Sequence, residues 1–257
     1  MKNNIVVLWS HPRSISTAFE RMMMNRGDFK ILHEPFAYVY YVLEKKGLPT
    51  GMIIDPEHPT QFEDIKNHIL NCSPQQHVFL KDMAYHCYEY LVKDESFLQK
   101  LVNTFIIRDP AKSIPSYYFL DHNITKNEIG YQQQYYLFEK IIELSGEIPV
   151  VIDADDLQSD PEAIIASYCK KINIKFLRSA LQWRSSYNQQ WDVWKIWHAD
   201  VASSSKIYSG SINQYEKNVT NNDIIRELYD YSLPFYKKMY QHRIVPDSTK
   251  ILEKLAR

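Results

Sequence analysis

Two stretches of the sequence place an arginine and several hydroxyl side chains directly after an apolar run. Residues 11–17 follow the apolar run Ile5–Trp9 and lead into a helical pattern. A helix that begins there presents free N–H groups and the positive end of its dipole, which attract anions. Arg13 can bind two anion oxygens at once, and hydroxyl donors follow at Ser14, Ser16 and Thr17. This predicts an anion-binding loop; the alternative is a plain helix cap by Ser14 or Ser16.

The second stretch is residues 105–117, where Arg108 ends an apolar run and Asp109-Pro110 is a typical helix start. Ligands of open α/β sheets bind at the carboxyl ends of strands, which is where Arg108 falls. Ser116 lies about two helical turns further on, and Pro115 removes a helical hydrogen bond and predicts a kink beside it. We predict a second anion site; the alternative is an ion pair between Arg108 and an acid.

Two separate anion sites on one sheet suit a ligand that carries two separated phosphate groups. The chain has only 6 glycines, and neither G-x-x-x-x-G-K-[ST] nor G-x-G-x-x-G occurs in it. Ordinary P-loop ATPases and dinucleotide-binding dehydrogenases need those patterns, so both classes are disfavoured. The contiguous triphosphate of ATP would also require one long loop and a magnesium site.

These motifs resemble those of the sulfotransferases that use 3′-phosphoadenosine 5′-phosphosulfate (PAPS). Residues 12–17 are similar to their 5′-phosphosulfate loop, P-[RK]-S-G-[ST]-[ST], and residues 108–116 to their 3′-phosphate motif. Residues 32–40 resemble the Glu-Pro segment of the carbohydrate branch, and residues 155–162 a strand-to-helix turn of the family. The four matches occur in the family's order and cover roughly residues 5–175.

The resemblance implies a site for PAPS and its product PAP that needs no metal. Its cofactor contacts would be Arg13, Ser14, Ile15, Ser16, Thr17, Arg108 and Ser116, with Ser204 and Lys206 standing in for a C-terminal loop. Glu34 would be the general base, with a pKa raised by burial, and Arg13 and Lys81 would supply positive charge. A Glu34–Arg13 ion pair and a solvated Lys81 are the plainer alternatives, and His33 and His11 are rival bases.

The sequence departs from the family pattern at two places. Ile15 stands where the loop has glycine, so either its backbone adopts a conformation open to a β-branched residue or the loop differs. After the third apolar run, Lys81-Asp82-Met83-Ala84 lacks the histidine of the cytosolic branch, and His86 is displaced from that position. This favours the branch that uses a glutamate as base.

Apolar runs alternate with helical patterns through the first part of the chain, which indicates an α/β fold with a mostly parallel sheet and helices on both faces. We predict one domain over residues 1–257, with a helical C-terminal third in which Pro234 interrupts a helix over Asn221–Tyr240. The predicted strands are Ile5–Trp9, Lys30–His33, His77–Lys81, Thr104–Arg108 and Pro149–Asp153. The predicted helices are Ser16–Asn25, Phe36–Lys46, Gln61–Leu70, Glu95–Val102, Ala111–Asp121, Glu128–Leu144 and Ser159–Lys171.

Composition and charge limit the kinds of binding partner that we expect for this protein. The net charge of −1 gives no reason to expect nucleic acid, and no run is long and apolar enough to span a membrane. Three scattered cysteines favour a reducing compartment, so we expect a cytoplasmic protein. A small molecule is the expected acceptor. Its predicted contacts are His33, Tyr38, Trp191, Trp194 and His198; the alternative places the tryptophans in the core or in a homodimer contact.

Two other functions are compatible with the motifs. A small-molecule kinase with a degenerate P-loop would need a loop lysine and a magnesium-binding hydroxyl, for which Arg13 and Ser14 are poor substitutes. A nucleotide-binding scaffold could keep the fold and lack activity, although the presence of Glu34 argues against it.

Overall fold

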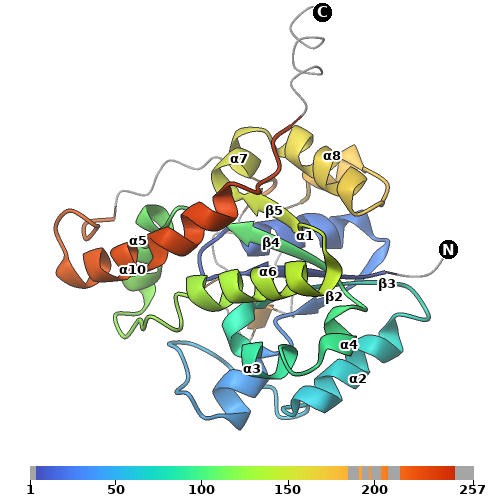
Figure 1. Ribbon diagram of the computed structural model, residues 1–257, viewed down its shortest axis with the longest axis horizontal. Coiled ribbons are helices and arrows are strands. Elements are labelled where there is room, and N and C mark those ends of the chain that lie inside the picture. Colours follow the sequence, from blue (N-terminus) through green and yellow to red (C-terminus); the bar gives the residue numbers. More distant parts are fainter. Residues whose placement is uncertain (1–3, 185–190, 193–196, 198–203, 208–214, 247–257) are drawn as a thin grey trace, which may run out of the picture.

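The computed structural model describes residues 4–184, 191, 192, 197, 204–207 and 215–246 (Figure 1). Their central feature is a five-stranded, all-parallel sheet in the order β2-β3-β1-β4-β5. The strands are β1 (Ile5–Ser10), β2 (Phe29–His33), β3 (His77–Met83), β4 (Val102–Ile107) and β5 (Val150–Asp153). All five predicted strands and the predicted α/β class are confirmed.

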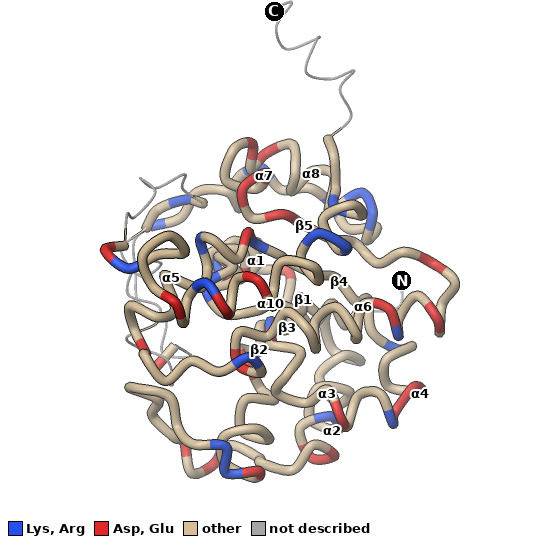
Figure 2. The backbone as a smooth tube through the Cα atoms, turned by 60° about the vertical axis from the view of Figure 1, so that its left-hand side comes forward, with Lys and Arg blue, Asp and Glu red and all other residues tan. Residues whose placement is uncertain are grey.

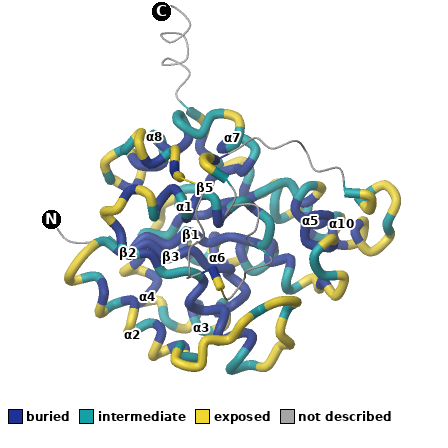
Figure 3. The backbone as a smooth tube through the Cα atoms, turned by 180° about the vertical axis from the view of Figure 1, so that it is seen from behind, coloured by how far each residue is buried: buried dark blue, intermediate teal, exposed yellow. Residues whose placement is uncertain are grey.

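Helices cover both faces of the sheet (Figure 1). Strand β1 is buried on both sides, which explains its uninterrupted apolar sequence. Val6 and Leu8 belong to the core cluster that contains residues of α1 (Ser16–Arg26) and α8 (Pro161–Lys171). Val7 belongs to the opposite cluster, with residues of α2 (Phe62–Cys72) and α6 (Tyr131–Ser145). Seen from behind, the strands lie in the buried centre (Figure 3).

The remaining helices complete the two layers and the carboxyl edge. They are α3 (Tyr88–Leu91), α4 (Glu95–Leu98), α5 (Pro110–Leu120), α7 (Ala154–Ser159) and α10 (Asp223–Tyr240), with short turns η1 (Val39–Leu43), η2 (Ala84–His86) and η3 (Arg178–Leu181). The predicted helix start at Asp109-Pro110 is confirmed, because the Asp109 carboxylate accepts from the Ala111 N–H. The Asp160 carboxylate caps α8 by accepting from the Ala163 N–H.

Three sequence-based predictions about helices differ from the structure. The helix predicted over Phe36–Lys46 is shorter, because only residues 37–43 are helical, and Val39–Leu43 form the π-helical turn η1. The helix predicted over Glu95–Val102 ends at Leu98, since Val102 pairs with Val6 of β1. Helix α10 runs on through Pro234, where packing against α5 and α6 offsets the lost hydrogen bond.

Basic and acidic residues are interspersed along the described elements (Figure 2). Within the described residues, no helix has the length and apolar character needed to cross a bilayer.

Candidate functional site

The loop between β1 and α1 has an unusual backbone. Arg13 and Ile15 both have a φ of 62°, in the left-handed region. Ile15 occupies the cap position of α1, and its carbonyl accepts hydrogen bonds from the Ala18 and Phe19 N–H groups. The Ser14 hydroxyl is fully buried and has no hydrogen-bond partner among the described residues. Ser14 therefore does not cap the helix, and its hydroxyl stays available to a ligand in the loop.

The expectation for Ile15 needs correction. Its backbone does not adopt a conformation that suits a β-branched residue, because φ 62° and ψ 14° lie in the region that glycine enters most easily. The Ile15 side chain packs against the core cluster that covers α1. The loop thus keeps a glycine-like backbone, and apolar packing helps to hold the isoleucine in it.

We expect this strain to be measurable with two substitutions. Ile15→Gly and Ile15→Ala both remove the packing of the side chain, but only glycine relieves the left-handed strain. The glycine variant should therefore be more stable than the alanine variant by about 1 kcal/mol in urea unfolding. Equal stabilities, or a more stable alanine variant, would show that the backbone at this position is not strained.

His11 fastens the loop to the neighbouring strand. Its Nδ1 donates to the Pro12 carbonyl at 3.0 Å, and its Nε2 accepts from the Arg108 N–H at 3.0 Å. The ring stacks on Tyr131 at 4.0 Å between centroids. Burial lowers the pKa of His11 to about 3, so the imidazole is neutral. With both nitrogens engaged, His11 is a structural residue and is not placed to act as the rival base.

Two residues of α6 and the turn before it complete this fastening. The Gln134 amide donates to the Trp9 carbonyl of β1 at 3.0 Å and to the Ile106 carbonyl of β4 at 2.8 Å. Gly130 has a φ of 76°, and a Cβ there would lie 3.1 Å from the Tyr85 ring. Glycine at position 130 therefore lets the start of α6 pack closely against Tyr85 and against His11, which follows β1.

The two predicted anion sites meet in the structure. Arg13 Nε donates to the Ser116 hydroxyl at 2.8 Å, and Arg108 Nη1 donates to the Arg13 carbonyl at 2.8 Å. Arg108 Nε is buried without a hydrogen-bond partner, and no described carboxylate forms an ion pair with Arg108. The predicted alternative of an Arg108 ion pair is therefore wrong. The guanidinium keeps a free donor at the carboxyl end of β4.

The residues present fit a ligand with two phosphate-type groups. Ser14 Oγ in the loop and Arg108 Nε at the strand end are buried polar atoms that lack partners, a state that is costly unless a ligand satisfies it. Ser16 and Thr17 are buried at the start of α1, where the helix N–H groups favour an anion. The loop would hold one group, and Arg108 with Ser116 the other.

Glu34 and Lys81 form a buried ion pair beside this loop. Glu34 Oε1 accepts from Lys81 Nζ, and both side chains are withdrawn from solvent. Register explains the contact: His33, at the end of β2, pairs with Lys81 on β3, and the Glu34 N–H donates to the Lys81 carbonyl. Glu34 follows with a φ of 44°, which aims its side chain back over the strand end.

The pair corrects three expectations. Burial opposes ionisation of Glu34, but the Lys81 ammonium and the neighbouring His33 and His86 outweigh it and hold the pKa of Glu34 below its ordinary value. The partner of Glu34 is Lys81, whereas the alternative had named Arg13. Lys81 is fully buried, so it is not a solvated strand end. At neutral pH the site therefore holds a carboxylate together with a fixed positive charge.

His33 and Trp191 lie on the α1 side of the site. His33 Nδ1 bonds the Glu20 carboxylate at 2.8 Å, and Trp191 Nε1 donates to the same carboxylate at 3.2 Å. Arg21 lies over the Trp191 ring at 5.6 Å from its centroid. Trp191 is fully buried, so its described contacts are with the protein core.

The other predicted contacts are spread around the site. Tyr38 accepts from the Asp55 N–H at 2.9 Å and stacks on His58. Ser204 and Lys206 lie beside the segment Gln182–Trp183. The Ser204 carbonyl accepts from Trp183 Nε1, and the backbone of Lys206 forms an isolated antiparallel β-bridge with Gln182. The cofactor role of Ser204 and Lys206 stays a prediction. Trp194 and His198 lie outside the described residues.

Sequence reasoning missed a second buried acid–base pair. Asp82 accepts from His86 Nδ1 at 2.6 Å and from the Phe36 N–H at 2.7 Å. It thereby holds the turn that follows Glu34, and His86 packs among the rings of Tyr40, Tyr41 and Tyr85. The sequence shows that Asp82 directly follows Lys81. It does not show that Asp82 contacts Phe36, because that hydrogen bond depends on the pairing of β2 with β3.

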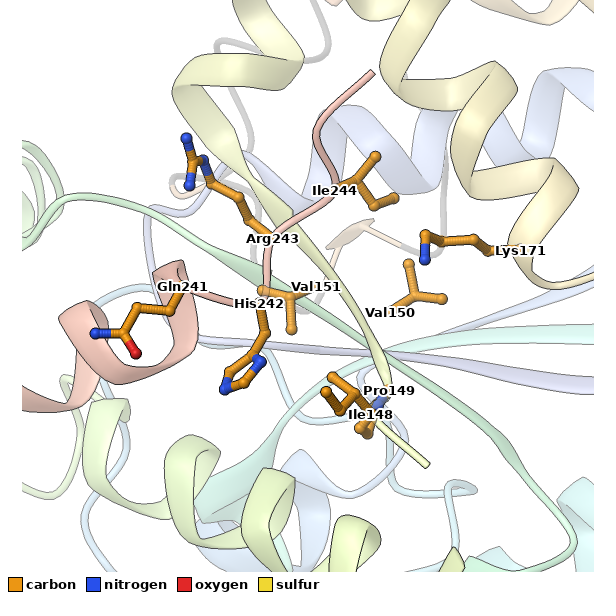
Figure 4. Close-up of a pocket in the computed structure, with 9 residues that line it drawn as sticks. All are labelled: Ile148, Pro149, Val150, Val151, Lys171, Gln241, His242, Arg243 and Ile244. Atoms are coloured by element: carbon orange, nitrogen blue, oxygen red, sulfur yellow. The ribbon is translucent and has the colours of Figure 1, made fainter. Parts of the chain in front are cut away.

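A shallow pocket lies beside the amino-terminal half of β5 (Figure 4). The segment Gln241–Ile244 passes along the strand there, and Arg243 is paired with Asp156 at 2.9 Å. The predicted anion-binding residues Arg13 and Arg108 follow the carboxyl ends of β1 and β4 and do not line this pocket, so the pocket takes no part in the candidate site.

The geometry agrees with comparisons with known proteins. Residues 4–243 match the family model described as a sulfotransferase domain, and the chain belongs to this family. Among solved structures, it resembles the sulfotransferase domain of the Synechococcus PCC 7002 olefin synthase, with a TM-score of 0.58 at 14% identity over 96% of this chain and 98% of that one. It also resembles a sulfotransferase from Alicyclobacillus acidocaldarius, with a TM-score of 0.50 at 10% identity over 95% and 98% of the two chains.

Two curated relatives come from Arabidopsis thaliana. The branched-chain-amino-acid aminotransferase-like protein 2 is 26% identical over 80% of this chain. The branched-chain-amino-acid aminotransferase-like protein 1 is 25% identical over 93% of it. The matched regions span only 36% and 42% of those two proteins, so both relatives are much longer than this chain.

Proposed function

We propose that this protein transfers a sulfuryl group from PAPS to a hydroxyl or amine of a small acceptor and releases PAP. The observation that carries the proposal is the meeting of Arg13, Arg108 and Ser116, with buried, unpartnered donors at Ser14 Oγ and Arg108 Nε. These groups offer two anion half-sites, which match the 5′-phosphosulfate and the 3′-phosphate of PAPS. Sulfotransfer itself is supported by the family and the fold.

PAPS, when bound, supplies the activated sulfuryl group. In the proposed reaction, the acceptor oxygen or nitrogen forms a bond to sulfur while the bond from sulfur to the 5′-phosphate oxygen breaks. The Glu34 carboxylate takes the proton of the acceptor. Protonation of Glu34 leaves the Lys81 ammonium without its counter-ion, so that its charge can act on the developing negative charge nearby. Arg13 adds the second positive group, from the loop.

Aromatic residues on the segments that follow Glu34 and Lys81 support a small acceptor. Tyr40, Tyr41 and Tyr85 form one buried cluster with Met83, and the partly buried Trp197 packs against it. Aromatic groups of this kind suit a small acceptor with apolar or aromatic parts. The small acceptor, the cytoplasmic location and a homodimer stay predictions.

Ligand-dependent unfolding tests the proposal against its two alternatives. A ligand at 100 times its Kd raises the free energy of unfolding by about 2.7 kcal/mol. We expect PAP and PAPS to raise the Tm without added metal, and ATP with Mg²⁺ to leave it nearly unchanged. Stabilisation by ATP–Mg²⁺ alone would favour a kinase. Stabilisation by PAP with no sulfation of any acceptor in a broad screen would favour a nucleotide-binding scaffold.

A further inference from the structure

Tyr215 reaches the nucleotide site from a distant part of the chain. Its hydroxyl donates to Ser116 Oγ at 2.9 Å across 99 positions of sequence. Ser116 is almost fully buried, and its oxygen also accepts from Arg13 Nε. The Tyr215 hydroxyl also interacts electrostatically with the Arg108 guanidinium. The Ser116 hydroxyl of α5 thus accepts hydrogen bonds from both Arg13 and Tyr215. Tyr215 is not part of any motif that the sequence analysis identified.

Packing holds the Tyr215 segment on α5. The Tyr215 ring contacts Phe119 at 5.6 Å between centroids, one turn beyond Ser116. Lys217 Nζ lies 6.0 Å from the centre of the Tyr118 ring, and the Glu216 carbonyl accepts from the Asn221 side chain at 2.7 Å. These contacts join the segment to α5 and to the turn that precedes α10, so Tyr215 is positioned before any ligand arrives.

Donors prevail around Ser116. It accepts two hydrogen bonds from Arg13 and Tyr215, and its own proton has no acceptor among the described side chains and backbone groups. Arg108 Nε is a further donor without a partner. Four O–H and N–H donors, from Arg13, Tyr215, Ser116 and Arg108, thus belong to one connected set of residues in which no described carboxylate is paired to Arg108, and such a set attracts a multiply charged oxyanion.

Resting on the proposed function, we propose that Tyr215 is a third ligand of the 3′-phosphate, beside Arg108 and Ser116. When the nucleotide binds, the Tyr215 hydroxyl turns its proton from Ser116 Oγ to a phosphate oxygen, and the residue thereby helps the site to select nucleotides that carry a 3′-phosphate. Tyr215 would act on binding and selectivity only, because its hydroxyl contacts Ser116 and not the Glu34–Lys81 pair.

Calorimetry with two nucleotides tests this role. PAP carries the 3′-phosphate and adenosine 5′-monophosphate (AMP) lacks it, whereas the rest of the two molecules is the same. In Tyr215→Phe, the ring and its contact with Phe119 remain and one donor to a charged acceptor is lost. We expect the Kd for PAP to rise about tenfold. The Kd for AMP should stay within twofold of the wild-type value, so the preference for PAP over AMP should fall about tenfold.

Tyr231→Phe is the matched control, because it removes a hydroxyl that donates to Gln132 at 2.8 Å on α6, away from the site. It should leave the affinity for both nucleotides unchanged. An unchanged Kd for PAP in Tyr215→Phe, or an equal loss for PAP and AMP, would overturn the role of Tyr215 while leaving the proposed function intact. A wild-type protein that fails to bind PAP would overturn both.

Discussion

Glu34→Gln should reduce kcat about a thousandfold while the Kd for PAP stays within threefold of the wild-type value. The amide keeps the size of the side chain but cannot take the acceptor proton, and positioned general bases contribute about 10²–10⁴ to the rate. PAP contacts the phosphate half-sites of the proposed site, which the substitution leaves in place. Steady-state sulfation assays and calorimetry with PAP measure the two quantities. A kcat near that of the wild type would exclude Glu34 as the base.

The pH profile separates Glu34 from a histidine base. The Lys81 ammonium holds the pKa of Glu34 below its ordinary value, so Glu34 is ionised throughout the neutral range. Loss of activity on acidification must follow protonation of the carboxylate, so kcat/KM should stay flat down to about pH 5 and fall only below it. A fall centred near pH 6.5 would point to a histidine instead.

Glu34→Gln also removes one charge of the buried Glu34–Lys81 pair, which lowers the stability of the protein. A second substitution separates this loss of stability from the effect on catalysis. Glu34→Gln leaves the Lys81 ammonium buried without its counter-ion, and breaking such pairs costs about 3–5 kcal/mol when one partner is removed. Adding Lys81→Met removes the orphaned charge and should recover most of the stability in urea unfolding. PAP affinity in the double variant then reports on the phosphate sites in a stably folded protein.

Arg108→Ala should weaken PAP binding at least a hundredfold. The substitution removes the unpartnered Nε donor and the Nη1 bond that holds the Arg13 carbonyl, so it affects both the 3′-phosphate half-site and the shape of the loop. A charge-assisted, two-pronged contact with phosphate accounts for a loss of this size. Isothermal titration with PAP measures it.

Two further substitutions calibrate that result. Arg108→Lys retains the charge but not the planar fork, so its affinity for PAP should lie between those of the wild type and the alanine variant. Arg178→Ala removes an exposed arginine that pairs with Glu162 and should leave PAP binding unchanged. If Arg108→Ala bound PAP as tightly as the wild type, the assignment of the 3′-phosphate would fail.

Most of the fold could be predicted from the sequence because each strand is a short apolar run that can be recognised without knowledge of its neighbours. In β1, an uninterrupted apolar run is followed by a helix start, and both features survive as β1 and α1. Local patterns were less exact over Phe36–Lys46, where residues 37–43 are helical but Val39–Leu43 form a π-helical turn. Periodicity locates the ends of a helix by its exposed face, and Phe36–Tyr41 are all buried.

The same limit applies to the site. Arg13 and Arg108 were predicted because each lies where an apolar run ends and a helix start follows, and Ser116 because residues 108–116 resemble the 3′-phosphate motif. Lys81 could be named as a charge, but its pairing with Glu34 follows from the register of two strands. Tyr215 carries no local signal at all, since only the folded chain brings it to Ser116.

The fastening of β1 to β4 by Gln134 has a thermodynamic consequence. Because one buried amide holds the Trp9 and Ile106 carbonyls at once, the separation between these two strand ends, and with it that between the two proposed phosphate half-sites, is set when the chain folds. The entropy lost in ordering the loop then belongs to the folding free energy and not to the binding free energy. The strand ends would then keep the two proposed half-sites at a fixed separation. A nucleotide whose two phosphates have that spacing would fit them without a rearrangement of the loop.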